Sequence, residues 1–269
     1  MAEKLNNTGE MSFLEHLEEL RWHIVRSAVS ILVFAVMAFI FSSFIFDSVL
    51  LAPKNPDFFT NRMLCRFAEI MNTPHLCINS APLKIQNIKM AGQFSTNIMV
   101  ALYVGLIIAF PYVIWEMWRF ISPALYENER KYARGSVGAI SVLFFLGALF
   151  GYFVIVPLTV HFLGGWQVSK EIANQIDLDS YFGTISFIPF ATGIIFELPV
   201  LMIFLTKAGL ITPSFMIKYR KHAIIVLMIL AAVITPPDIF SMILVVLPLL
   251  LLYEFSIILT KRIAKKMTQ

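Results

Sequence analysis

Three carboxylates crowd a short segment near the start of the chain, at Glu15, Glu18 and Glu19. The S-x-x-E pattern that begins at Ser12 is typical of a helix start, and apolar and acidic residues then repeat with a helical period. Residues 12–23 therefore predict an amphipathic helix at a membrane surface. Because anionic lipid attracts lysine and arginine rather than glutamate, this acidic face is either simply solvated or a site for a basic ligand.

A second acidic segment follows Phe120 and contains Glu127 and Glu129. These carboxylates have Arg130 and Lys131 close by as partners, and exposed pairs of that kind contribute little to stability. The functional interpretation is a second acidic element on the same face of the protein as Glu19. Together the two segments indicate a surface that binds a positively charged ligand.

Glu197 lies inside an apolar run, where a carboxylate costs about 2.5–3.5 kcal/mol on membrane-insertion scales. An ionisable group at such a depth is a functional hypothesis, and Pro199 is expected to bend the helix around it. The alternative is a protonated, hydrogen-bonded glutamate with a structural role. Glu254, near the inner end of the last apolar run, is closer to water and is a weaker candidate.

The elements that must position these residues are apolar helices. The chain is 58% hydrophobic and only 14% charged, whereas soluble domains contain about 25% charged residues. Of six apolar runs, five have the ~20 residues that a helix needs to cross a bilayer. The remaining run, which is the fifth in chain order, is shorter. The six runs are residues 24–46, 94–118, 137–163, 181–206, 223–234 and 239–260. The composition predicts an all-α polytopic membrane protein with a single membrane domain.

The short fifth run has two interpretations. At ~1.5 Å per residue it covers about 18 Å, so it is either part of a re-entrant hairpin or a short span that thins the bilayer locally. The short span is favoured, because Lys218, Arg220 and Lys221 precede the run and four basic residues follow the sixth run. The turn between the two runs then lies on the far side of the membrane.

The distribution of basic residues predicts that both termini are cytoplasmic. Of the 21 lysines and arginines, 15 then lie in cytoplasmic segments and 6 in outer loops. The first outer loop, residues 47–93, contains both cysteines of the chain, Cys65 and Cys77. On the oxidising side of the membrane they are candidates for a disulfide, the alternative being two unpaired thiols.

Several function classes lack support in the sequence. Residues 1–23 include no apolar core of a cleavable signal peptide. Phosphate-binding loops and hydrolase motifs are absent, and the histidines are scattered, so we expect no enzyme, no metal site and no cofactor. The remaining alternative to the binding function is an ion-coupled transporter of small solutes that uses Glu197 as its intramembrane site.

A series of motifs, in order along the chain, resembles the landmarks of the TatC family of the twin-arginine (Tat) protein translocase. The matching segments are 12–21, 110–118, 120–130, 196–199, 209–212, 220–221 and 235–240. The resemblance implies six helices in a concave bundle, the fifth and sixth short, in the bacterial cytoplasmic membrane. It also implies recognition of twin-arginine signal peptides on folded precursors, single-span partners of the TatA and TatB type, a homo-oligomeric receptor complex and transport driven by the protonmotive force. It implies no nucleic-acid partner.

Carried over residue by residue, the resemblance makes Glu19 and Glu129 the carboxylates that receive the two arginines, with Phe120 and Arg21 beside them. A guanidinium forms two parallel hydrogen bonds with a carboxylate, which explains the preference for arginine over lysine. The resemblance makes Glu197 the polar residue that faces the concavity. The other family motif positions are Pro53 and Asp238. The first outer loop is longer than expected for the family, and its cysteines match no family motif.

Overall fold

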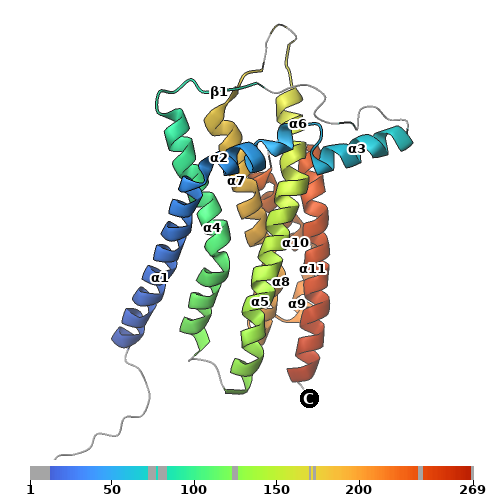
Figure 1. The fold of residues 1–269 in the computed structure, drawn as a ribbon. Coiled ribbons are helices and arrows are strands. Elements are labelled where there is room, and N and C mark those ends of the chain that lie inside the picture. The colour runs from blue at the N-terminus through green and yellow to red at the C-terminus, as the bar shows by residue number, and fades with distance from the viewer. Residues whose placement is uncertain are drawn as a thin grey trace, which may run out of the picture.

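The chain is almost entirely helical in the computed structural model (Figure 1). The described residues are 13–71, 77, 84–122, 127–169, 171, 174–235 and 239–267; within them, only the backbone is described at 13–15, 127–136, 239–241, 244, 266 and 267. Asp238 and the start of the predicted capping box at Ser12 lie outside the described residues.

Among the described residues, four helical stretches are long and apolar enough to cross a membrane: His16–Ile40, Gly92–Ile121, Val137–Gly165 and Leu178–Lys207. Between 11% and 33% of the residues in their most apolar windows are buried inside the protein, so lipid must cover much of the remaining apolar surface. These stretches correspond to the first four predicted spans. The prediction of an all-helical multi-span membrane protein is confirmed.

The amino-terminal amphipathic segment is not a separate surface helix. It forms the first turns of α1 (Phe13–Ile40), which continues without a break into the first span. No glycine or proline occurs in α1, so nothing in its sequence interrupts the helical hydrogen bonds. The regular helix ends before the predicted limit of the span at residue 46, and α2 (Ser42–Phe44) and the π-helical η1 (Ile45–Leu50) follow it. α1 packs against α4 (Gly92–Ile121).

The third and fourth spans are each interrupted. α5 (Glu127–Phe150) passes through the π-helical η5 (Gly151–Ile155) into α6 (Val156–Gly165). α7 (Leu178–Ile195) ends in a turn at Phe196–Glu197, after which α8 (Leu198–Lys207) begins. Pro199 stands in the first turn of α8, where its missing N–H is tolerated. The expected distortion of the helix is therefore found as a two-residue turn just before Pro199.

Close packing of the third and fourth spans depends on two glycines. A Cβ added at Gly147 would lie 2.7 Å from the carbonyl oxygen of Thr192 in α7. One added at Gly151 would lie 2.2 Å from Thr192 Oγ1 and 2.9 Å from Pro189 Cα. The missing side chains let η5 and the end of α5 approach the backbone of α7.

The described residues between the first two spans form a cap that includes η2 (Ala52–Lys54), α3 (Phe59–Ile70) and β1 (Ile85–Gln86). β1 pairs in parallel with β2 (Ile176–Asp177), with Ile85 opposite Ile176. Lys89 Nζ donates to Asp179 Oδ2 at 2.7 Å, and this contact raises the pKa of Lys89. The cap is thereby tied to the start of α7.

The last helices are α9 (Pro213–Lys218), α10 (Arg220–Ile234) and α11 (Ile239–Met267). α10 has 15 residues, so the helix at the fifth apolar run is short, as expected. α11 is longer than expected, because it continues past residue 260 through the basic tail to Met267. The buried core joins α7, α10 and α11, and its members include Ile185, Ile188, Leu227, Val245 and Leu249.

Candidate functional site

One end of the bundle collects the residues that the sequence singles out for ligand binding. In the lower part of Figure 1, the start of α1, the end of α4, the start of α5 and the end of α11 lie at the same end. We call this the lower end, and the end that carries α3 and β1 the upper end. The acidic segment of α1 and the segment that begins at Phe120 therefore share one end of the molecule.

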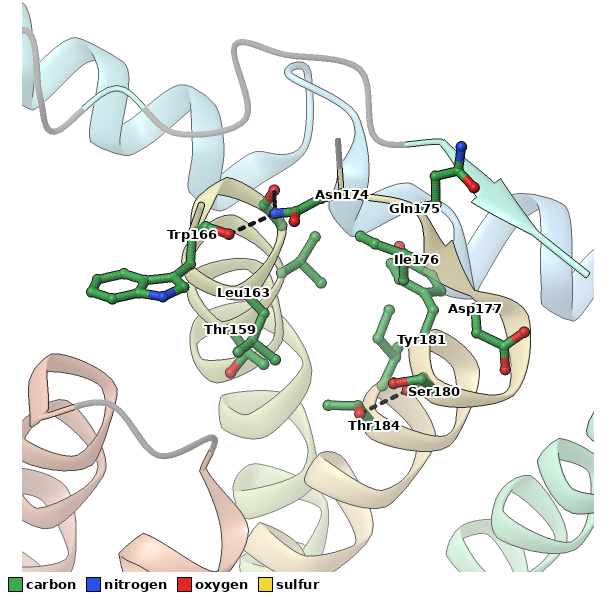
Figure 2. A pocket seen from close by; sticks show the side chains of 13 residues that line it. Thr159, Leu163, Trp166, Asn174, Gln175, Ile176, Asp177, Ser180, Tyr181 and Thr184 are labelled. Atoms are coloured by element: carbon green, nitrogen blue, oxygen red, sulfur yellow. Dashed lines mark hydrogen bonds between the residues drawn. The ribbon is translucent and has the colours of Figure 1, made fainter. Parts of the chain in front are cut away.

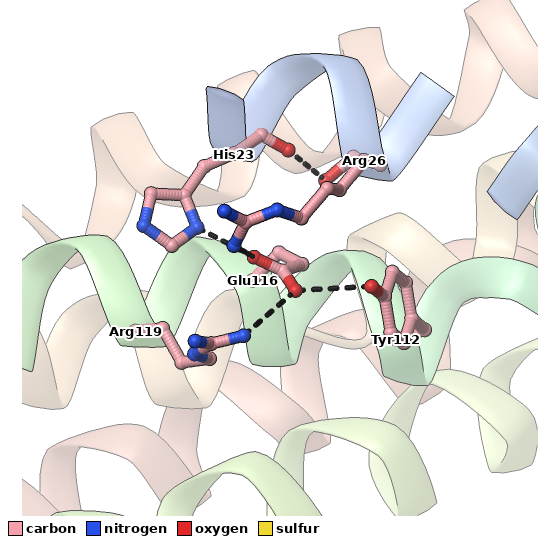
Figure 3. Close-up of polar contacts among 6 residues, drawn as sticks. His23, Arg26, Tyr112, Glu116 and Arg119 are labelled. Carbon is pink, nitrogen blue, oxygen red and sulfur yellow. Dashed lines mark hydrogen bonds and ion pairs between the residues drawn. The ribbon is translucent and has the colours of Figure 1, made fainter. Parts of the chain in front are cut away.

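A buried carboxylate joins α1 to α4 at the lower end (Figure 3). Glu116 is 1% exposed, and its Oε2 lies 2.5 Å from His23 Nδ1 and 3.6 Å from an Arg26 guanidinium nitrogen. Its Oε1 accepts hydrogen bonds from the Tyr112 hydroxyl at 3.0 Å and from Arg119 Nη1 at 3.2 Å. Both oxygens are therefore satisfied, by His23 and Arg26 of α1 and by Tyr112 and Arg119 of α4.

This arrangement fixes the relative position of the two helices. Burial of a carboxylate costs several kcal/mol, and here the two arginines and the charge-assisted hydrogen bonds offset that cost. Because His23 and Arg26 belong to α1, α1 cannot slide along α4 without removing these two partners from Glu116. We call these five residues the Glu116 cluster: His23, Arg26, Tyr112, Glu116 and Arg119.

Phe120 lies one turn after Glu116 in α4, and its side chain contacts α1. Its ring stacks on His16 with centroids 4.5 Å apart, and it meets His23 edge to face at 6.0 Å. His16, Glu19 and His23 are three and four residues apart, so they lie on one face of α1. The half-buried Glu19 is therefore on the face that contacts Phe120.

The other two residues predicted to bind the ligand are Glu129 and Arg21. Glu129 belongs to the first turn of α5, at the lower end, and its side chain is outside the described part of the structure. Arg21 is exposed and lies on the side of α1 away from His16 and His23. Arg21 therefore does not lie on the face of α1 that carries Glu19 and contacts Phe120.

Glu197 occupies the N-cap position of α8, in the turn that separates it from α7. Both of its carboxylate oxygens are buried, and neither makes a hydrogen bond of normal geometry with a described residue. The described residues thus provide no hydrogen-bonded network of the kind that a purely structural glutamate requires.

The remaining predicted positions have local structural contacts. Pro53 is buried in η2, and its carbonyl accepts a hydrogen bond from Asn61 Nδ2 at 3.1 Å. Glu254 Oε2 pairs with Arg220 Nη2 at 2.9 Å, joining α11 to α10. Cys65 and Cys77 are joined by a disulfide in the cap.

Glu116 was not among the residues singled out from the sequence. The available signal was the one used for Glu197, a carboxylate inside a predicted span, here residues 94–118. His23, the partner of Glu116 on α1, is 93 residues away in the sequence. No periodicity along the chain indicates a contact over such a separation.

A cavity of about 340 Å³ lies at the upper end, between α6, α7 and the segment that precedes β2 (Figure 2). Its lining includes Thr159, Trp166, Asn174, Asp177 and Tyr181. Asn174 Nδ2 donates to the carbonyl of Trp166 at 2.6 Å, which closes the loop beside the cavity. None of the residues predicted to bind a ligand lines it.

Comparisons with known proteins agree on one family. The model of the family described as Sec-independent protein translocase protein (TatC) matches residues 15–248. The TatC protein of Blattabacterium sp. subsp. Periplaneta americana is 40% identical over 97% of this chain and 99% of its own length. That of Aquifex aeolicus is 34% identical over 95% of this chain and 97% of its own length.

Solved structures give the same result. A crystal structure described as the twin arginine translocase receptor TatC has a TM-score of 0.69 and 33% identity, covering 92% of this chain and 98% of its own. A second structure, of TatC in DDM, has a TM-score of 0.72 and 32% identity. From its sequence motifs, its helical architecture and these matches, we conclude that the chain belongs to the TatC family of Sec-independent protein translocase proteins.

Proposed function

We propose that this chain is the signal-peptide receptor of a twin-arginine translocase and binds the two arginines at the lower end of the bundle. The observation that carries the proposal is the contact of Phe120 with His16, which sets an aromatic ring beside the carboxylate-bearing face of α1. Family membership and the description of a solved relative as a twin arginine translocase receptor support it. The family's role is transport, not enzymatic catalysis.

In this proposal Glu19 and Glu129 receive the guanidinium groups. Glu19 makes no ion pair with a described residue, so its carboxylate is available to a ligand. Glu116, by contrast, is already bound by Arg26 and Arg119. Phe120 covers the peptide and excludes water, which strengthens the ion pairs beneath it.

The same proposal covers the partners and the energy source. Single-span subunits of the TatA and TatB type join several copies of this chain in the bacterial cytoplasmic membrane, with both termini cytoplasmic. Glu197 offers their helices, or a passing precursor, an unpaired carboxylate within the membrane. The protonmotive force drives transport. The solute-carrier alternative is not retained, because the family is one of protein translocases.

The test is binding of a fluorescent twin-arginine signal peptide to the purified full chain in lipid nanodiscs. Hydrogen bonds to charged groups contribute about 1.5–3 kcal/mol, so Glu19→Ala or Glu129→Ala should weaken binding by about 10- to 150-fold. The matched control is Glu18→Ala, an exposed neighbour of Glu19 on a different face of α1. Wild-type affinity in both variants, or equal affinity for a twin-lysine peptide, would place the recognition site elsewhere.

A further inference from the structure

α3 in the cap presents an apolar stripe that no described residue covers. Phe59, Met63, Phe67 and Ile70 are spaced by four, four and three residues, so they share one face of the helix. They are 58%, 43%, 50% and 77% exposed. A row of exposed aromatic and aliphatic side chains of this kind is unfavourable in water and indicates a partner.

The opposite face of α3 is turned toward the cap. Asn61 is fully buried, and its Nδ2 donates to the carbonyls of Pro53 and Asn55. Ala68 is also buried on this side, and Cys65 carries the disulfide there. The apolar stripe therefore points away from the cap, and the disulfide lies on the side of the helix opposite to it.

The attachment of α3 to the bundle places the stripe at the membrane interface. Phe59 meets Phe153 edge to face at 6.4 Å, and the Thr60 hydroxyl donates to the Phe153 carbonyl. At ~1.5 Å per residue, Phe153 lies about 24 Å along the third span from Val137. A hydrocarbon core of ~30 Å that begins at Val137 thus reaches just beyond Phe153.

Phe153 is itself 36% exposed on a membrane-spanning segment, so its outer surface faces lipid. Phe59 continues that surface onto α3, and Figure 1 shows α3 running across the long axis of the bundle and beyond its edge. Arg62 and Arg66 are exposed along one border of the stripe, where their stems can follow apolar surface while the guanidinium groups reach phosphates.

We propose that α3 is an interfacial anchor whose stripe, formed by Phe59, Met63, Phe67 and Ile70, inserts into the outer leaflet of the bilayer, with Arg62 and Arg66 bound to phospholipid phosphates. The occupant of this face is the lipid surface itself. The disulfide between Cys65 and Cys77 then lies on the aqueous side of α3 and closes the loop that follows it.

The experiment uses the full chain with p-benzoylphenylalanine in place of Phe67, in nanodiscs of phosphatidylethanolamine and phosphatidylglycerol. The matched control carries the same photoprobe in place of Glu69, which is exposed on the polar side of α3. After illumination, mass spectrometry of the α3 peptide should find adducts on the acyl chains of phospholipids for position 67, and far fewer for position 69, which lies on the same border of the helix as Arg62. Absence of lipid adducts at position 67, equal yields at both positions, or cross-links from 67 to another protein chain would each overturn the proposal.

A second variant tests the stripe as a unit. With the photoprobe in place of Met63, Phe67→Asp should abolish the lipid adduct, because the carboxylate lifts the helix from the hydrocarbon. The oxidised Cys65–Cys77 peptide pair, measured in the same digest, shows that the cap is still folded. Retention of the adduct in a folded cap would contradict insertion of the stripe.

Discussion

Glu116 and Glu254 are both paired glutamates, but their surroundings differ. The side chain of Glu116 is 2% exposed and has four partners, whereas the side chains of Glu254 and Arg220 are 45% and 46% exposed. Water screens an exposed pair and solvates its members when the pair is broken. When a buried carboxylate loses its partners, no water takes their place.

The first prediction follows from this contrast. Glu116→Gln should lower the free energy of unfolding by about 1–3 kcal/mol, because the amide loses the charge that pairs with Arg26 and Arg119 and has one accepting oxygen in place of two. Thermal unfolding of the purified protein in detergent measures the effect. The control, Glu254→Gln, should change stability by less than about 1 kcal/mol. Equal effects of the two substitutions would show that the Glu116 cluster contributes no more than a surface pair.

The second prediction concerns Glu197. Because neither oxygen makes a hydrogen bond of normal geometry with a described residue, Glu197→Leu removes a desolvated polar group and breaks no such bond. The variant should unfold at the same or a higher temperature than the wild type, yet fail to support export of a twin-arginine precursor in cells. Full export by the variant would reduce Glu197 to a residue without a transport role.

At the scale of elements, two spans are held together by backbone contact. η5 meets α7 at Gly151, where a methyl group would fall within 2.9 Å of Pro189 Cα. The Thr192 hydroxyl is also in the way, and the backbone of Pro189 cannot move aside as a side chain could. The close packing of these helices therefore depends on a residue without a Cβ.

The third prediction is that Gly151→Ala lowers stability by about 1–3 kcal/mol through overpacking. The matched control is Gly138→Ala in α5, where an added Cβ meets nothing within 4 Å. That substitution should leave stability unchanged or raise it by about 0.5–1 kcal/mol, because alanine is the better helix former. Thermal unfolding of both variants in the same detergent is the measurement. If Gly151→Ala were as stable as the control, the observed packing of η5 on α7 would be wrong.

At the scale of the whole molecule, the two ends of the bundle have different chemistry. The lower end collects the Glu116 cluster, Phe120 and the basic end of α11, and the upper end holds the cap with its disulfide. Disulfides persist on the oxidising side of the membrane, and basic residues favour the cytoplasmic side. Both observations favour a cytoplasmic lower end.

The fourth prediction tests this orientation. A membrane-impermeant maleimide added to intact cells should label Cys65 and Cys77 only after reduction of their disulfide. Labelling of both cysteines without reductant would show that they are unpaired in cells, and lack of labelling after reduction would contradict their outward placement. A chain with Cys65→Ser and Cys77→Ser is the control for background labelling.

Hydropathy alone was sufficient for the approximate limits of the first four long apolar helices, because a membrane span must satisfy its backbone internally and cover itself with apolar side chains. For the same reason Glu197 stood out as a carboxylate within a span. The series of motifs from Ser12 to Phe240, taken together, indicated the family, which the comparisons then confirmed.

The sequence did not indicate the pairing of Glu116 with α1, the stacking of Phe120 on His16, or the parallel pairing of β1 with β2. It also suggested a separate surface helix where α1 is continuous, and a bend where the chain forms a two-residue turn at Phe196–Glu197. Each of these features depends on which side chains meet across helices. Periodicity along one segment determines which face of a helix is apolar, whereas its register against a neighbour depends on contacts between residues distant in the chain, and only the tertiary structure determines those.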